Sequence, residues 1–508
     1  MDGLSEADSP SSWRSTPCRH MRATKGISAT EPLDDMVSTA LAILSEDCTT
    51  PSDQGGDGNV HQGRPLITYS RGLDTYEFLR QRSIFDFPVH HVRLQFLQAY
   101  LHYVYPGQPC INFDDVYNLE LQLPDSPRSP LLMWSILSAA CPFVDINAIR
   151  ETGHPSRLEA QAAMISRAKL AYQVGTEKDH LVQIQSLLLM SLWQGDNDGL
   201  LEAPYWLAQA LSIAKSTRLD IAVGKSTCPT SGLKRRIWWC IYIRDVQIAL
   251  TYHRPCQVHE MYGTALSITE SDFEQIEGNP HSFSLFHPSV VPVRCDGSRK
   301  WLAALFIQKA KLYHKTSRAL SSLYSVSWTL NSVGDACSVL YPKDGVCAKD
   351  VLVHQLSLED WIRDLPLEMP GFDKNENNSA SFILQHTALR IECLFAQCMV
   401  IQSQPPDEMN QCMPPGIQMV SSQIVSLARN LHSDGLGRFL PASCMAAIGF
   451  TTEVFSLQMS RYGTNSGTEA FVSYLVCVAL LRTLEAIHPV PPCYISSLHT
   501  PITKAMKE

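Results

Sequence analysis

Apolar side chains recur at intervals of three and four residues through most of the chain, which is the period of an α-helix. Short segments rich in Gly, Pro, Asn and Asp separate one such run from the next. No alternation of apolar and polar residues is sustained over several segments. The pattern predicts an all-α fold, a large multi-helix domain over 66–490, and leaves open whether it is one domain or two abutting subdomains. The helices are predicted at 129–140, 179–194, 203–220, 233–253, 301–324, 354–365, 384–402, 419–433, 442–460 and 468–487.

Two of these helices start with recognisable capping residues. Ser129 is expected to cap the first, because it is followed by Pro130 at the position where a helix tolerates proline best. Asp179 is expected to cap the run that follows it, which is apolar on nearly every side. A helix without a polar face is typical of a protein core.

The first 65 residues have a different composition. They hold ten acids and five bases, so they contribute −5 of the formal net charge of −9. Ser, Thr, Pro and Gly are frequent, and residues 51–59 resemble a flexible linker. We therefore expect a disordered acidic N-terminal tail over 1–65, and a second, short tail at 491–508.

One segment of the tail, 31–47, has the spacing of a short amphipathic helix with acids at both ends. Isolated helices of roughly 12–15 residues are marginal in water, so this one needs a surface to dock on. That surface could belong to a partner, such as a coactivator or a DNA-binding subunit, or to the helical domain of the same chain. The candidate docking residues are Leu33, Val37, Leu41 and Leu44.

Composition limits the function classes. Hydrophobic residues make up 45% of the chain and charged residues 18%, which excludes a wholly disordered protein. An acidic chain has no global attraction for nucleic acid, so DNA contact would need a local patch or a partner. The N-terminus has no basic and apolar leader, and no apolar run reaches the ~20 residues of a membrane helix. We expect a soluble, intracellular protein with no membrane partner.

Residue patterns that carry catalysis or metal binding are missing from the sequence. It contains no phosphate-binding glycine loop and no nucleophile elbow. The pair Asp114–Asp115 has Asn118 where a chelating carboxylate would be expected on the next turn. The 16 cysteines include no C-x2-C pair, so no zinc site is predicted. We assign no catalytic, cofactor-binding or metal-binding residue and expect no cofactor and no enzyme activity.

The segment 232–258, GLKRRIWWCIYIRDVQIALTYHRPCQV, is the most informative in the chain. It resembles a signature of the fungal-specific transcription factor regulatory domain, also called the middle homology region. Arg244 precedes Asp245 where that family more often has Asp before Arg, and His253 replaces the usual Gly of a Gly-Arg-Pro turn. The matching residues, called the signature residues below, are Arg235, Arg236, Trp238, Trp239, Asp245, Arg254 and Pro255.

Other segments resemble the same family in the family's order. They lie at 100–117, 129–145, 157–194, 205–220 and 356–370, and in the fourth of them Arg218 takes the place of a usual Gly. The spacing is similar to that of the cutinase-activator subgroup. The resemblance implies a fungal transcription regulator, located in the nucleus, that controls secondary-metabolite, nutrient-use or cutinase genes.

The signature segment has a clear physical interpretation. Its core, IWWCIYI, is apolar all round, so the helix should be central in the fold. Arg235 and Asp245 would lie about 15 Å apart along it and cannot pair with each other. We expect each charge to find a partner on another helix, because an unpaired buried charge costs several kcal/mol. The signature residues are therefore expected to hold the fold, and direct contact with an effector or DNA is the alternative.

Full-length members of that family usually carry a binuclear zinc cluster built from six cysteines. Residues 1–65 contain only Cys18 and Cys48, which cannot supply it. The regulator is thus expected to act without its own zinc-cluster domain, and to reach DNA weakly or through a partner. Two alternatives stay open: a truncated gene model of a zinc-cluster factor, and an all-α enzyme with an unrecognised pocket. The sequence does not predict the oligomeric state.

Overall fold

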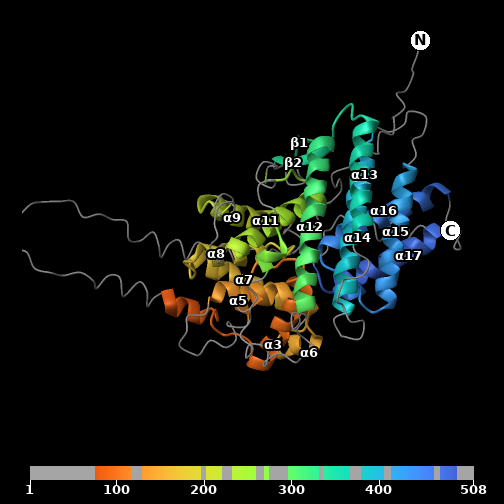
Figure 1. Ribbon diagram of the computed structural model, residues 1–508. Coiled ribbons are helices and arrows are strands. Elements are labelled where there is room, and N and C mark those ends of the chain that lie inside the picture. The colour runs from red at the N-terminus through yellow and green to blue at the C-terminus, as the bar shows by residue number, and fades with distance from the viewer. Residues whose placement is uncertain are drawn as a thin grey trace, which may run out of the picture. The chain divides into compact units, whose positions relative to one another are not determined.

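The fold is seen in a computed structural model (Figure 1). The chain divides into two units, Met1–Phe78 with Leu330–Asp335, and Leu79–Thr329 with Ala336–Glu508, and the second holds the helical fold. The candidate docking residues of segment 31–47 and both predicted tails lie outside the described residues. The structure describes residues 75–113, 115–116, 129–195, 202–219, 231–258, 268–273, 296–330, 336–365, 379–404, 414–462 and 469–488.

The first group of helices packs around α5, every residue of which is buried. Helix α5 lies against α7 and α8, and α8 lies against α9. The elements of this group are α3 (His90–Ala99), the π-helical turn η1 (Tyr100–Val104), α5 (Pro130–Ala140), η2 (Cys141–Phe143), α6 (Ile146–Glu151), α7 (Arg157–Val174), α8 (His180–Met190) and α9 (Glu202–Ser216).

The second group is made of longer helices. Helix α14 packs on α15, and α16 packs on α17. Helix α11 contacts α8 and α9 of the first group as well as α12 and α16 of the second. The elements are α11 (Ser231–Tyr252), η5 (Glu270–Phe273), α12 (Asp296–Leu323), α13 (Ala348–Asp364), α14 (Ser379–Gln402), α15 (Pro415–Ser433), η7 (Gly437–Phe439), α16 (Ser443–Tyr462) and α17 (Glu469–Glu485).

The all-α prediction is confirmed, and the ten predicted helices overlap observed ones. Both predicted caps are present: Ser129 Oγ accepts the N–H of Leu132, and an oxygen of Asp179 accepts the N–H of Leu181. The helices α7 and α9 also begin near polar residues, Ser156 and Glu202. No helix within the described ranges is long and apolar enough to cross a membrane.

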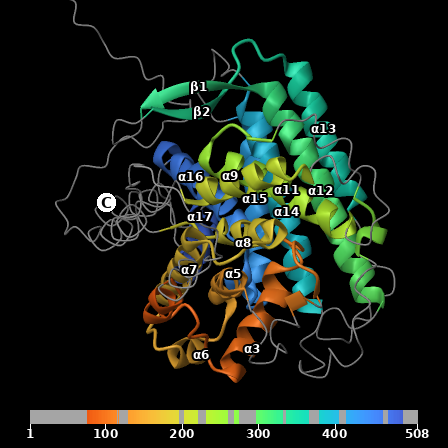
Figure 2. The same cartoon turned by 90° about the vertical axis from the view of Figure 1, so that its left-hand side faces the viewer.

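Within the described residues, the all-α pattern is interrupted by a two-stranded sheet of β1 (Tyr324–Leu330) and β2 (Ala336–Pro342). The segment between the strands was expected to be a break between helices. Figures 1 and 2 place this hairpin beside the end of α12, on the side of the unit that carries α9 and α11. Just outside the strands, Lys343 N–H donates to the carbonyl of Leu323 at 2.9 Å. This bond brings the end of β2 beside the start of β1, so the two strands run antiparallel.

Candidate functional site

The signature segment forms α11, and its residues from Arg236 to Leu250 are buried without interruption. Trp238 is 1% exposed and Trp239 is 6% exposed. The helix contacts α8, α9, α12, α16 and η5, so the predicted central position is confirmed. A helix apolar on all sides is stable only when other elements cover every face.

The N-terminal end of α11 is fixed by contacts with η5. Arg235 Nε donates to Asp272 Oδ1 at 2.6 Å, and the Asp272 carboxylate is fully buried. The other carboxylate oxygen accepts the N–H of Thr269 at 2.8 Å, which fixes the turn. Gly232 lies against the backbone of η5, because a Cβ at Gly232 would come within 2.9 Å of the Asp272 carbonyl oxygen. Arg235 thus has the partner on another element that its burial requires.

Arg236 connects α11 to the segment that precedes α5. Its guanidinium donates to the carbonyl of Pro109 at 3.1 Å and to Asn112 Oδ1 at 2.5 Å. It also lies over the ring of Phe273 in η5, 5.4 Å from the ring centroid. Asn112 in turn donates to Asp115. The two arginines of the signature therefore fix η5 and the 109–112 segment against one end of the helix.

Arg244 and Gln247 hold the middle of α11. The Arg244 guanidinium donates to the carbonyl of Ser191, at the end of α8, and to Gln247 Oε1. Gln247 donates to the hydroxyl of Tyr313 in α12 and to Glu392 in α14, at 3.2 and 3.4 Å. These contacts cross from the first group of helices to the second.

Glu392 is the centre of a buried polar network. Its carboxylate accepts from Ser443 in α16 at 2.5 Å and lies 3.8 Å from the ammonium of Lys309 in α12. The side chains of Lys309 and Glu392 are 9% and 3% exposed. Four helices, α11, α12, α14 and α16, are joined through this one carboxylate.

The prediction of a partner on another helix is not met by the hydrogen bonds of Asp245 among the described residues, where Lys215 of α9 only lowers its pKa through charge. Asp245 Oδ2 accepts the backbone N–H groups of Gln257 and Val258, both at 2.8 Å, in the chain that follows α11. The reason is geometric, because α11 ends at Tyr252 and its continuation turns back along the helix. Burial raises the pKa of Asp245 to about 6, against the lowering effect of the two N–H bonds. The Asp245 carboxylate fixes the turn that contains Arg254 and Pro255.

The two residues that stand where the family usually has glycine share a backbone conformation. His253 has φ 51° and Arg218 has φ 53°, both in the left-handed region that glycine adopts without strain. The carbonyl of His253 accepts the N–H of Leu340 at 2.7 Å, which attaches the hairpin to the end of α11. Arg254 and Pro255 follow and are half-buried. The positions require a left-handed residue whichever side chain occupies them.

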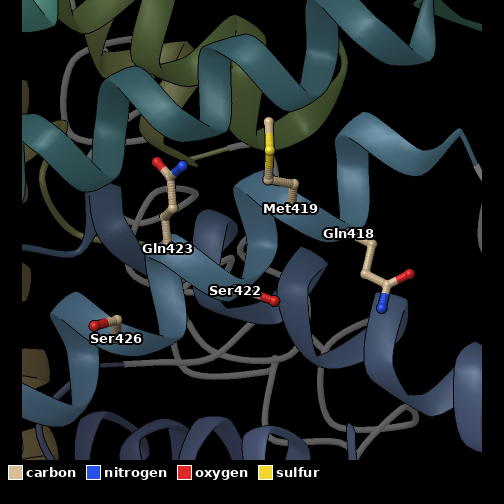
Figure 3. A pocket seen from close by; sticks show the side chains of 5 residues that line it. All are labelled: Gln418, Met419, Ser422, Gln423 and Ser426. Carbon is tan, nitrogen blue, oxygen red and sulfur yellow. The ribbon is translucent and has the colours of Figure 1, made fainter. Parts of the chain in front are cut away.

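The structure has a shallow hollow away from the signature, on one face of α15 (Figure 3). Its lining is uncharged: Gln418, Met419, Ser422, Gln423 and Ser426. Figure 3 shows Met419 and Gln423 pointing to the same side of the helix. Across the described ranges, no group of three or more His, Cys, Asp or Glu side chains could hold a metal ion. The hollow presents amide, hydroxyl and thioether groups and no charged side chain.

Several residues around α11 were not identified from the sequence. Asp272 had a local signal, since Thr269-x-x-Asp272 is the spacing of a capping box, in which the side chain returns to the first N–H. Asn112, Ser191 and Glu392 had none, because each meets α11 only in the folded chain.

Comparisons with known proteins identify the family of the chain. Residues 86–363 match the family described as "Fungal specific transcription factor domain". The chain is 25% identical to "Transcription factor cpaR" of Aspergillus oryzae, over 74% of this chain and 65% of that protein. It is 25% identical to "Cutinase transcription factor 1 beta" of Fusarium vanettenii, over 84% of this chain and 51% of that protein.

A third relative matches a shorter part of the chain. The chain is 25% identical to "Fusaric acid cluster transcription factor FUB12" of Fusarium oxysporum, over 34% of this chain and 25% of that protein. The chain spans between half and two thirds of the length of the first two relatives. The family match covers more than half of this chain and includes all of α11, so the chain belongs to the fungal specific transcription factor domain family.

Proposed function

We propose that this chain is the regulatory domain of a fungal transcription regulator and acts in the nucleus. The observation that carries the proposal is the match of the family over 86–363, with the signature forming the central helix of the fold. The named activities of the relatives, on cutinase and on a fusaric acid cluster, favour nutrient-use or secondary-metabolite genes as targets. We infer that it has no catalytic activity of its own.

The signature residues serve the fold in this proposal. Arg236, Trp238, Trp239 and Asp245 are buried, so they have no surface to offer to DNA. The Arg236 guanidinium and the Asp245 carboxylate are used in hydrogen bonds with backbone atoms of other segments. Such contacts give one arrangement of the helices rather than a binding face.

Contact with DNA is proposed to be weak or to pass through a partner. The formal net charge is −9, which opposes the approach of a duplex unless a local patch or a second protein compensates. A DNA-binding subunit or a coactivator is the partner class that fits a regulator of this charge.

The test is a deletion strain compared with wild type by transcript profiling, joined with chromatin immunoprecipitation of the tagged full chain. We expect the genes whose transcripts change to be concentrated among the promoters that the chain occupies. The occupancy should be lost when the partner is removed, and the purified chain alone should not retard the same promoter fragments. Tight, sequence-specific retardation by the chain alone would show direct binding instead.

An enzyme would give a different result. Deletion would then change the concentration of a metabolite while the transcript profile stayed the same, and no promoter would be occupied. That outcome would contradict the proposed regulator and support the alternative of an all-α enzyme.

A further inference from the structure

Helix α13 has an apolar face on its outer side. Leu352, Val353 and Leu356 are 52%, 55% and 47% exposed, so three large aliphatic side chains lie together in water. The opposite side of the helix packs on α12 and α14 and buries Leu358 and Trp361. Figure 2 shows α13 at one side of the second unit, next to α12. Single exposed aliphatic residues are common on protein surfaces, but a contiguous group of them marks an interaction surface.

The adjacent helix α12 has a different outer side. Its exposed positions within the described residues are all polar: Lys300, Lys311, Arg318, Ser321 and Ser322. An amphipathic helix normally presents polar side chains of this kind to water. Helix α13 is therefore apolar on two sides, and its outer side would be stabilised by a covering element.

The exposed face of α13 has the spacing of a helix–helix contact. Lys349, Val353, Leu356 and Asp360 follow one another after four, three and four residues, which is the heptad spacing of paired helices. All four are exposed, and we call them the α13 seam. At 3.6 residues per turn they lie within about 60° of one another and on the opposite side of the helix from Leu358. The α13 seam thus points away from α12 and α14, where another helix can approach it.

The order of residues in the α13 seam is complementary to itself. A base stands at one end and an acid at the other, with two aliphatic residues between them. If two copies of α13 run antiparallel about a two-fold axis midway between Val353 and Leu356, Val353 faces the partner's Leu356. Lys349 then faces the partner's Asp360, and symmetry forms each contact twice. A parallel pair would bring like charges together at both ends, so charge favours the antiparallel order.

We propose that the α13 seam is an interface between two copies of this chain, which pair through antiparallel α13 helices. The Asp360 carboxylate is 55% exposed and accepts from Arg363 at 2.9 Å within the same helix, so it has room for the partner's Lys349. Val353 and Leu356 exclude water from the centre of the contact. The contact is only one helix long, which is short for a protein interface, so the dimer forms at micromolar rather than nanomolar concentrations.

The experiment is sedimentation velocity of the full chain over a series of micromolar concentrations. We expect the dimer fraction of the wild-type chain to rise with concentration. Lys349→Glu and Asp360→Lys each turn both attractive pairs of the dimer into repulsive ones. Each variant should raise the dimer Kd by about tenfold or more. Circular dichroism reports whether each variant keeps its helix content.

Mixing the two charge variants tests the antiparallel order itself. In the mixed dimer the new acid of one variant faces the new base of the other, and the second pair is the native Lys349 with the partner's Asp360. An equimolar mixture of Lys349→Glu and Asp360→Lys should therefore dimerise with a Kd close to that of wild type. Damage to the fold of either variant would not be repaired by mixing, so this recovery is specific to the proposed contact.

The apolar centre has a matched control in α17. Val353→Ser/Leu356→Ser should raise the dimer Kd by about tenfold or more. Val472→Ser/Leu475→Ser replaces two residues of α17 that are 44% and 42% exposed, and it should leave the Kd unchanged.

Four outcomes would overturn the assignment. The wild-type chain could remain a monomer throughout the series, which would leave the α13 seam for a different protein. The dimer could persist in Val353→Ser/Leu356→Ser. The mixture of charge variants could associate no more tightly than each variant alone. The dimer could also be lost in Val472→Ser/Leu475→Ser, which would locate the interface on α17.

Discussion

Asp245 is a buried carboxylate that receives two backbone N–H groups, and the charge of Lys215 lowers its pKa less than burial raises it. Its pKa of about 6 lies above the value of about 3.9 in an unfolded chain. The folded protein therefore binds more protons between these two values, and this group contributes its full stability below about pH 4. That contribution is lost as the pH rises through about 6, by about 3 kcal/mol in total.

Asp245→Asn tests this directly, because the amide oxygen can still accept both N–H groups and carries no charge. The free energy of unfolding of wild type relative to Asp245→Asn should increase by about 3 kcal/mol when the pH falls from 7 to 4. Urea unfolding followed by circular dichroism at several pH values measures it. Asp245→Ala leaves two buried donors unpaired and should cost about 2–5 kcal/mol at pH 7. A pH-independent difference between wild type and Asp245→Asn would show that the carboxylate does not titrate in this range.

His253 holds a left-handed conformation that costs a non-glycine residue roughly 1–2 kcal/mol. His253→Gly should raise the free energy of unfolding by up to about 1 kcal/mol, since part of the gain is offset by the greater freedom of glycine in the unfolded chain. His253→Ala is the control, because alanine keeps the strain. Equal urea midpoints for the two variants would mean that the left-handed conformation at position 253 does not strain a non-glycine residue.

At the scale of elements, η5 is a single turn fixed to α11 by close approach at Gly232. A Cβ at Gly232 would meet the backbone of Asp272, which cannot move away as a side chain could. Gly232→Ala should therefore lower the free energy of unfolding by about 1–3 kcal/mol. Gly416→Ala is a matched control in α15, where the Cβ would meet only the end of the Ile401 side chain. Thermal unfolding of both variants checks the prediction, which fails if Gly232→Ala melts at or above wild type.

The helices were predictable because each has a local apolar period or capping residue within a few turns of the chain. The apolar period of 129–140 and the Ser129–Pro130 start are local, and local patterns also mark the end of α11. The hairpin also has a local sequence pattern, but this pattern directly follows a long helical run. Residues Tyr324–Leu330 alternate apolar and polar without exception, and a Gly follows in the connection.

The partners of the signature could be predicted only in part. Burial of Arg236 followed from the apolar sequence around it, and so did its need for an acceptor. The acceptors themselves, Pro109 and Asn112, are 127 and 124 residues away along the chain. No periodicity encodes such a contact, since it depends on how the helices pack. Asp245 shows the opposite case, where the partner was nearby in sequence and a distant one was expected.

At the scale of the whole molecule, the Glu392 network decides whether the helices unfold together. Glu392 accepts from Gln247 and Ser443 and pairs with Lys309, so it links α11 with α12, α14 and α16. Helix α11 also contacts α8 and α9 of the first group. The described helices of the second unit form one compact unit joined through α11 and Glu392, and we predict that they unfold cooperatively.

Glu392→Ala removes the anion and leaves the Lys309 ammonium buried without a counter-charge, which should cost about 3–5 kcal/mol. The double variant Lys309→Met/Glu392→Leu removes both charges and should recover most of that loss. Hydrogen exchange followed by mass spectrometry measures where protection is lost. In Glu392→Ala, α5 in the first group and α17 in the second should lose protection to the same extent, although neither contains a residue of the network. Loss confined to α12, α14 and α16 would contradict the prediction and would mean that two subdomains meet at α11, each with its own stability.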